Sequence, residues 1–149
     1  ETITPTNTIP SKVFSGFKKA CHNLYKFDSK SEKDFAAILE KDTDVLKWLR
    51  PADSQFELYW KYNSKRYHPD FVVETADTIF MVEIKAEKDI DDTEVQEKAE
   101  AGKKYCESAT VFNLANGGKQ WVYVLIPHTA VAPNMSLKGL CSVNNLSRK

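Results

Sequence analysis

Residues 79–85 alternate between two kinds of side chain and predict a β-strand with two different faces. The segment reads Ile-Phe-Met-Val-Glu-Ile-Lys, and successive side chains of a strand point to opposite faces of the sheet. One face therefore carries apolar residues, whereas the other carries a methionine, Glu83 and Lys85. The segment 70–74 begins with Asp70 and is rich in Phe and Val, which favours a second strand. Ionisable groups are thus placed in a sheet, where burial is costly unless another charge compensates them.

The two strands are predicted to form a hairpin, because only the short polar segment 75–78 separates them. With Ala76 and Asp77 at the tip, Asp70 lies directly opposite Glu83 on the same face. Directly opposed Cβ atoms are about 4.5–5.5 Å apart. Two carboxylates at that distance repel each other unless a cation lies between them. The pattern therefore predicts a divalent-cation site of the kind found in metal-dependent phosphodiesterases, and a register shift of one residue would destroy it.

The first fifty residues predict helices. Apolar residues at spacings of three and four indicate an amphipathic turn or helix over 11–24. The polar segment 28–31 has helix N-cap residues, and the helix that follows is expected to run to about Lys41. A short second helix is expected at 44–49, because Pro51 would end it.

Beyond Pro51 the chain predicts strands at 55–62, 67–74, 79–86 and 120–126. The clearest helix covers 91–109 and carries a continuous stripe of mostly small residues, which allows it to approach a sheet closely. That stripe consists of Val95, Ala99, Gly102, Cys106 and Ala109. Ser136 is expected to cap a last short helix. Since a strand–helix–strand connection crosses over right-handed, the strands on either side of helix 91–109 should be parallel. The expected fold class is α/β, with a central mixed sheet flanked by helices.

Composition narrows this picture without changing it. The 149 residues suit one domain with a sizeable core, and 42% apolar with 28% charged residues is typical of soluble globular proteins. No apolar run approaches the ~20 residues that span a membrane. We expect a linker or N-terminal arm at 1–11 and one domain at 12–149. Because the sequence begins with Glu1 and not with methionine, we expect it to be a piece of a longer chain.

Net charge and cysteine content leave the partner open. The formal net charge is zero, which neither requires nor excludes nucleic acid. Cys21, Cys106 and Cys141 are odd in number and far apart, so a disulfide framework or a zinc site is not expected. This cysteine usage fits a reducing, cytoplasmic setting.

Pro69-Asp70 followed by Glu83-Ile84-Lys85 resembles the core signature of the PD-(D/E)xK nuclease superfamily. Further segments resemble the C-terminal nuclease domain of type III restriction endonuclease Res subunits and related DEAD/DEAH-box helicase-nucleases, and the similarity covers about residues 12–145. Those segments are 26–29 with Glu32, 46–51 and 123–128. The resemblance implies a restriction-endonuclease-like fold and Mg²⁺-dependent cleavage of double-stranded DNA. Relatives with a RecB-like core carry Gln-x-x-x-Tyr on the helix after the lysine strand; here Ala101 precedes Tyr105, so that element is absent or replaced.

The resemblance also implies roles at the site. Asp70 and Glu83 are expected to bind Mg²⁺, or Mn²⁺ in its place, with the carbonyl oxygen of Ile84 as a third protein ligand. Lys85 is expected to hold the attacking water or to stabilise charge that develops on the phosphate. The alternative for the two acids is a solvent-facing pair on an edge strand, and the alternative for Lys85 is a surface lysine paired with Glu83.

Glu32 is the candidate acid from the first long helix, which in this superfamily often completes the metal site. Asp28 and Glu40 compete for that role. Glu32 also fits a local role, because Ser29-x-x-Glu32 is a capping-box pattern.

Candidate DNA contacts are less specific. Lys65, Arg66, Lys103 and Lys104 are basic residues that could bind phosphates, and each could equally be an ordinary solvated residue. His68 lies two positions before Asp70, but a lone histidine is more often structural. The expected partners are double-stranded DNA, a helicase or translocase domain N-terminal to this chain, and a DNA-methyltransferase or recognition subunit; no membrane is expected.

The sequence therefore predicts a Mg²⁺-dependent endonuclease domain that serves as the cleavage module of a type III-like restriction enzyme subunit. The alternative is a catalytically inactive nuclease-fold module for DNA binding or subunit docking. Inactive relatives usually lose an acid or the lysine, whereas Asp70, Glu83 and Lys85 are all present here, which favours the enzyme. A stand-alone junction resolvase is a third and weaker idea.

Overall fold

The computed structural model describes residues 6–61 and 64–146. A four-stranded mixed sheet lies at its centre, in the order β1-β4-β5-β6. The strands are β1 (Val45–Leu49), β4 (Phe71–Thr75), β5 (Thr78–Lys85) and β6 (Gln120–Pro127). The pairs β1–β4 and β4–β5 are antiparallel, whereas β5 and β6 are parallel. The predicted α/β class and mixed sheet are confirmed, and so is the parallel pair on either side of the long helix.

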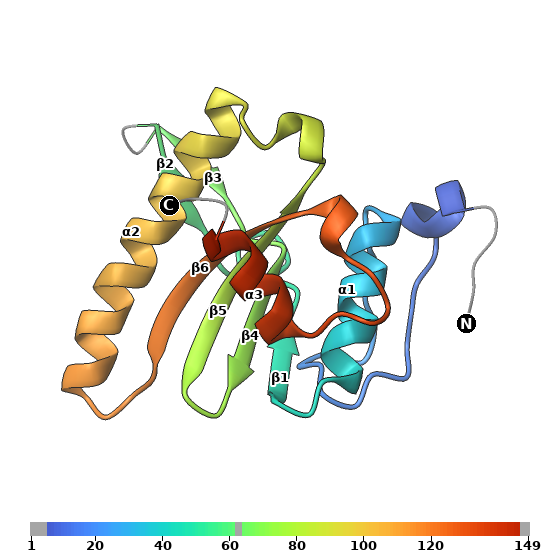
Figure 1. Cartoon of the computed structure of the whole chain (residues 1–149), viewed down its shortest axis with the longest axis horizontal. Helices are drawn as coiled ribbons and strands as arrows, with labels where there is room; N and C mark the ends of the chain where they lie inside the picture. Colours follow the sequence, from blue (N-terminus) through green and yellow to red (C-terminus); the bar gives the residue numbers. More distant parts are fainter. Residues whose placement is uncertain (1–5, 62–63, 147–149) are drawn as a thin grey trace.

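The two faces of the sheet build separate apolar layers. Val82 and Ile84 pack in the main core with buried residues of α1 (Lys30–Lys41) and α3 (Leu137–Leu146). Met81 packs on the other face, in a smaller cluster with Cys106 of α2 (Thr93–Ala115) and Leu58 of β2 (Leu58–Trp60). The long helix α2 runs beside β6, while α1 and α3 lie on the other side of the sheet (Figure 1). The alternation of β5 therefore divides its side chains between two cores, as the sequence predicts.

The predicted hairpin register is correct. Phe71 pairs with Val82, and Glu74 pairs with Ile79. The connection is tightened by the Thr75 side chain, whose Oγ1 accepts a hydrogen bond from the backbone N–H of Thr78 at 3.2 Å. β4 begins at Phe71, so the strand expected at 67–74 starts later than predicted, and Asp70 lies immediately before it.

Two predicted helices are wrong. Residues 11–24 form an irregular segment that pairs only through isolated bridges, one of them between Phe14 and Tyr25. Gly16 has a φ of +87°, which ends any helical continuation there. The segment predicted as a helix at 44–49 is strand β1. Its pairing with β4 shifts between Val45 and Lys47, and such a bulge breaks the two-residue alternation, so the buried residues fall three apart as in a helix.

The remaining elements follow the predicted order with shifted ends. The strand expected at 55–62 is the shorter β2, which pairs with β3 (Lys65–Tyr67) in a separate two-stranded sheet. Helix α2 extends to Ala115, beyond the predicted end at residue 109. Ser136 precedes α3, and its Oγ accepts a hydrogen bond from the backbone N–H of Gly139 at 3.0 Å, as a cap does.

Short 3₁₀ helices complete the chain. They are η1 (Thr6–Ser11), η2 (Glu87–Asp89) and η3 (His128–Ala130). Ile9 of η1 is buried in the main core, and residues 1–5 of the expected arm lie outside the described residues. No helix within 6–61 and 64–146 has the length and apolar character needed to cross a bilayer.

Helix α2 approaches the sheet most closely at Gly102. A Cβ atom at this position would lie 2.5 Å from ring carbons of Tyr123 and 3.0 Å from the hydroxyl of Tyr67. The neighbouring residues of the predicted stripe, Ala99 and Cys106, are also buried. The stripe of small residues therefore permits the contact between α2 and β6, as predicted.

We expect Gly102→Ala to lower the free energy of unfolding by about 1–3 kcal/mol, because the added methyl group overpacks the contact with Tyr123. This cost must exceed the gain of ~1 kcal/mol that alanine brings to a helix interior. Urea denaturation measures the difference, and Ser108→Ala on the exposed side of the same helix is the matched control. Equal or greater stability of Gly102→Ala would contradict the close approach.

Candidate active site

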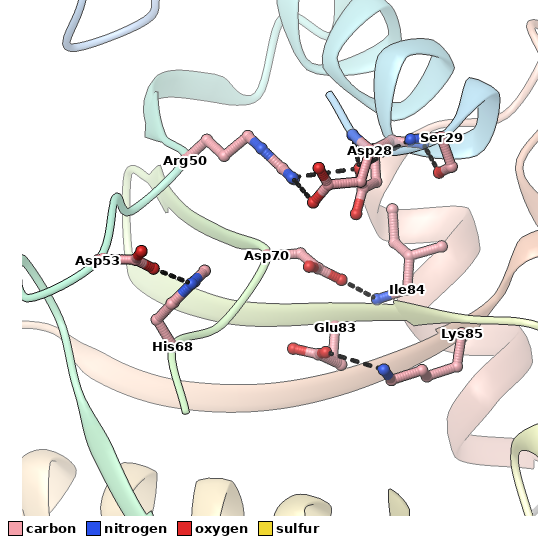
Figure 2. Close-up of polar contacts among 10 residues, drawn as sticks. Asp28, Ser29, Arg50, Asp53, His68, Asp70, Glu83, Ile84 and Lys85 are labelled. Carbon is pink, nitrogen blue, oxygen red and sulfur yellow. Dashed lines mark hydrogen bonds and ion pairs between the residues drawn. The ribbon is translucent and has the colours of Figure 1, made fainter. Parts of the chain in front are cut away.

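Charged side chains from four elements gather at the end of the sheet where β5 finishes. Glu83 and Lys85 come from the last residues of β5, and Asp70 comes from the residue before β4 (Figure 2). Glu32 comes from the first turn of α1, and Arg50 directly follows β1. We call Glu32, Asp70 and Glu83 the acidic cluster.

Asp70 is held by the backbone of the opposite strand. Its Oδ2 accepts a hydrogen bond from the N–H of Ile84 at 2.8 Å, which Figure 2 shows as a dashed line. Burial raises the pKa of Asp70, while this hydrogen bond and the charges of Arg50 and Lys85 act in the opposite direction. The contact uses the N–H of Ile84, and the expected role of the Ile84 carbonyl oxygen as a ligand stays a prediction.

Glu83 is the most deeply enclosed acid of the hairpin, with only 7% of its surface exposed. Its Oε1 lies 3.8 Å from Nζ of Lys85, and its Oε2 is buried without a hydrogen-bond partner. Burial and the nearby charge of Asp70 raise the pKa of Glu83 to about 8, although the positive charges of Lys85 and Lys98 lower it. A buried carboxylate oxygen without a partner is costly, and a cation would satisfy it.

Glu32 has the local capping role that the sequence predicted, and it also lies beside Asp70. Its Oε2 accepts hydrogen bonds from the backbone N–H groups of Asp28 and Ser29, at 2.6 and 3.2 Å, and so completes a capping box at the start of α1. The carboxyl group also lies close enough to Asp70 for the two acids to interact electrostatically. Burial raises the pKa of Glu32, and the charge of Asp70 raises it further. Two carboxylates this close repel each other when both are ionised, so in the absence of a cation the pair favours retention of a proton.

The competing acids are engaged elsewhere. Glu40 accepts hydrogen bonds from the backbone N–H groups of Lys18 and Lys19 and from the indole of Trp48, so it anchors the irregular N-terminal segment. Asp28 has 85% of its side chain exposed and pairs with Arg50 at 2.8 Å. Glu32 is thus the acid that the structure brings to Asp70.

The residue set suits a hard cation that keeps most of its water. No group of three His, Cys, Asp or Glu side chains in the described parts of the chain is arranged to enclose a metal ion. Mg²⁺ usually needs only one or two carboxylates and retains several waters. Asp70 and Glu83 meet that requirement across the hairpin, and the buried, unpartnered Oε2 of Glu83 fits a ligand position.

The four predicted DNA-contact residues lie outside the acidic cluster. Lys65 and Arg66 are exposed on β3, where the Lys65 ammonium sits 5.5 Å from the ring centre of Trp60 and Arg66 pairs with Glu57 at 3.3 Å. Lys103 and Lys104 lie on α2, on the face of the sheet that also carries the β2–β3 pair. Their roles stay predictions.

Sequence reasoning assigned no site role to two groups that border the cluster. Arg50 pairs with Glu32, and its charge lowers the pKa of Asp70. Lys98 of α2 contributes positive charge near Glu83. For Arg50, the sequence offered one indication, a single arginine between an apolar strand and Pro51. For Lys98, which is one of several lysines on a long helix, the sequence offered no such indication. His68 pairs with Asp53 at 3.0 Å, away from the acids, which suits the structural interpretation.

A mixed sheet with two acids and a lysine at the end of its central hairpin defines a PD-(D/E)xK-type nuclease domain. The family model described as TnsA-like endonuclease N terminal matches residues 30–112. This match covers more than half of the chain, so the chain belongs to the TnsA-like endonuclease N-terminal family. The matched residues include Glu32, Arg50, Asp70, Glu83 and Lys85. No curated protein matched the chain.

The raised pKa of Glu83 predicts how stability depends on pH in the absence of metal. The folded protein keeps the proton of Glu83 between its ordinary pKa of 4.5 and its raised pKa of about 8, whereas the unfolded chain loses it. The free energy of unfolding therefore falls as pH rises through this window. We expect Glu83→Gln to weaken this dependence and to melt higher than the wild type at pH 8.

Thermal unfolding in the presence of a chelator, from pH 5 to pH 8, measures this effect. Glu100→Gln, an exposed acid on α2, is the control and should leave the dependence unchanged. A Glu83→Gln protein with the wild-type pH dependence would show that Glu83 is not protonated in the folded state.

Proposed function

We propose that this domain is a Mg²⁺-dependent endonuclease that hydrolyses phosphodiester bonds of double-stranded DNA. The observation that carries the proposal is the meeting of Asp70 and Glu83 at the end of the β4–β5 hairpin, where Asp70 accepts a hydrogen bond from Ile84 and Oε2 of Glu83 is buried without a partner. Membership of an endonuclease family supports the same chemistry.

Each residue of the hairpin has a separate task in this proposal. Asp70 and Glu83 would hold the cation, with the carbonyl oxygen of Ile84 as a further ligand. The hydrogen bond from the Ile84 N–H keeps Asp70 oriented before the cation arrives. Glu32, which contacts Asp70, adds a third acid at the edge of the site. Bound Mg²⁺, or Mn²⁺ in its place, supplies Lewis acidity toward the phosphate and lowers the pKa of water.

In this proposal, Lys85 holds the attacking water or stabilises the charge that develops on the phosphate. Its side chain lies on the same face of β5 as Glu83, and its Nζ is 3.8 Å from Glu83 Oε1. About a third of the side chain is exposed, so the ammonium group can meet a substrate from solvent while it remains beside the acid. A cation in this place stabilises negative charge that develops on the phosphate oxygens.

We also propose a wider setting for the domain. The resemblance of segments 26–29, 46–51 and 123–128 supports a type III-like restriction subunit, with a helicase or translocase domain N-terminal to this chain and a DNA-methyltransferase or recognition subunit as partner. The net charge of zero supports a division of labour, since a neutral domain gains little from counterion release at phosphates. Three free cysteines suit a cytoplasmic location.

Metal binding should raise the melting temperature of the wild-type domain, because the folded state presents paired acids and the unfolded chain does not. Asp70→Asn and Glu83→Gln should each abolish most of this rise. Differential scanning fluorimetry with Mg²⁺, Mn²⁺ or chelator measures it, and Glu100→Gln should respond as the wild type does. An equal shift in the wild type and both site variants would refute the metal site.

Lys85→Ala should separate binding from chemistry. It removes a cation and no metal ligand, so the Mn²⁺-induced rise in melting temperature should persist while nicking of supercoiled plasmid falls by roughly 10²–10³. Lys47→Ala, which removes an exposed lysine of β1, is the matched control. Wild-type nicking by Lys85→Ala under single-turnover conditions would rule out the assigned role. Metal binding without nicking in the wild type would favour the inactive-module alternative.

A further inference from the structure

Arg50 occupies a place that is unusual for a charged side chain. It directly follows β1, and only 12% of its side chain is exposed. Its guanidinium carbon lies 5.6 Å from the ring centres of both Phe27 and Phe71, which are themselves fully buried. A guanidinium enclosed by aromatic rings is poorly placed to meet DNA phosphates. Its function is therefore to be found among the protein groups that it touches.

Arg50 contacts one acid of α1 and one acid that lies two residues before this helix. Its Nη2 lies 2.8 Å from Oδ2 of Asp28 and 3.2 Å from Oε2 of Glu32. Asp28 is largely exposed, whereas Glu32 has only 9% of its side chain exposed. An ion pair with the buried partner is screened far less by water and salt than one with the exposed partner. Glu32 is therefore the energetically important partner of Arg50.

Three donors meet at one oxygen of Glu32. The N–H groups of Asp28 and Ser29 and the guanidinium of Arg50 all lie within 3.2 Å of Oε2. Oε1 carries none of these contacts. The carboxyl group cannot rotate without breaking its contacts with these three donors. The contacts at Oε2 therefore fix the orientation of the carboxyl group. The carboxyl group held in this way is the one that interacts electrostatically with Asp70.

Arg50 also balances charge in the cluster. Burial raises the pKa values of Glu32 and Asp70, the charge of Asp70 raises that of Glu32 further, and the guanidinium lowers both. The two backbone donors at Oε2 carry no net charge, so Arg50 is the contact of Glu32 that supplies a full positive charge.

We propose that Arg50 is a positioning residue of the nuclease site, which holds Glu32 through Oε2 so that Oε1 stays directed toward Asp70 and the cation. This inference rests on the proposed function, since it assigns Glu32 a place beside the bound metal. Arg50 touches neither substrate nor metal in this arrangement. It positions the site through Glu32, and lysine cannot replace it fully because an ammonium group lacks the planar guanidinium that packs on the rings of Phe27 and Phe71.

The test is a double-mutant cycle in which isothermal titration calorimetry measures the dissociation constant of Mn²⁺ for the whole chain and its variants. Arg50→Lys and Glu32→Gln should each weaken Mn²⁺ binding about 10-fold, the lower end for loss of an outer contact of a metal ligand. The double variant should be little weaker than either single variant, because both changes remove the same interaction. Asp28→Asn, which removes only the exposed partner, should bind Mn²⁺ as the wild type does.

Other results would overturn the inference. Arg50→Lys with a lowered melting temperature and an unchanged dissociation constant would assign Arg50 to packing only. Additive effects in the double variant would show that Arg50 does not act through Glu32. If Arg50→Lys does not fold, an unchanged dissociation constant in Glu32→Gln would suffice to reject the proposal. Absence of Mn²⁺ binding in the wild type, by contrast, would refute the metal site itself.

Discussion

The antiparallel pairing of β4 with β5 is the constraint on which the arrangement of the site depends. Apolar residues of β5 enter one core through Val82 and Ile84 and the other through Met81, so both layers resist any slip of the strand. A slip by one residue would turn Glu83 and Lys85 into the main core, where neither charge has a place. The packing that stabilises the sheet thus also determines which groups meet at its end.

Charge at this end of the sheet is only partly balanced. Burial raises the pKa of each acid of the cluster, while Arg50, Lys85 and Lys98 offset part of that effect. Each acid is therefore shifted toward its protonated form, and a bound divalent cation would shift it back toward the ionised form. Buried acids with incomplete charge compensation would destabilise a purely structural ion pair. Strongly shifted pKa values of this kind are instead typical of functional sites, here one that would bind a cation.

The hairpin could be predicted from the sequence because its two signals, alternation and a short polar connection, are local. Strand β1 could not, since the bulge between Val45 and Lys47 gives it a helical spacing of buried residues. Arg50 was missed as a site residue for a different reason. Its partner Asp28 lies 22 positions away, and no pattern within one element connects the two. The capping role predicted for Glu32 is confirmed, its role at the metal site stays a prediction, and only the fold shows that the same carboxyl group lies beside Asp70.

The capping box of α1 has a consequence for which sequences this fold can tolerate. The Glu32 side chain caps the start of α1 and also interacts electrostatically with Asp70. Glutamine at position 32 would still accept hydrogen bonds from the start of the helix but would lose the negative charge. Aspartate would keep the charge, but its side chain is shorter by one methylene group. Natural variation at this position is therefore expected to be narrower than at ordinary capping residues, and any homologue that changes it should carry a compensating change at Arg50.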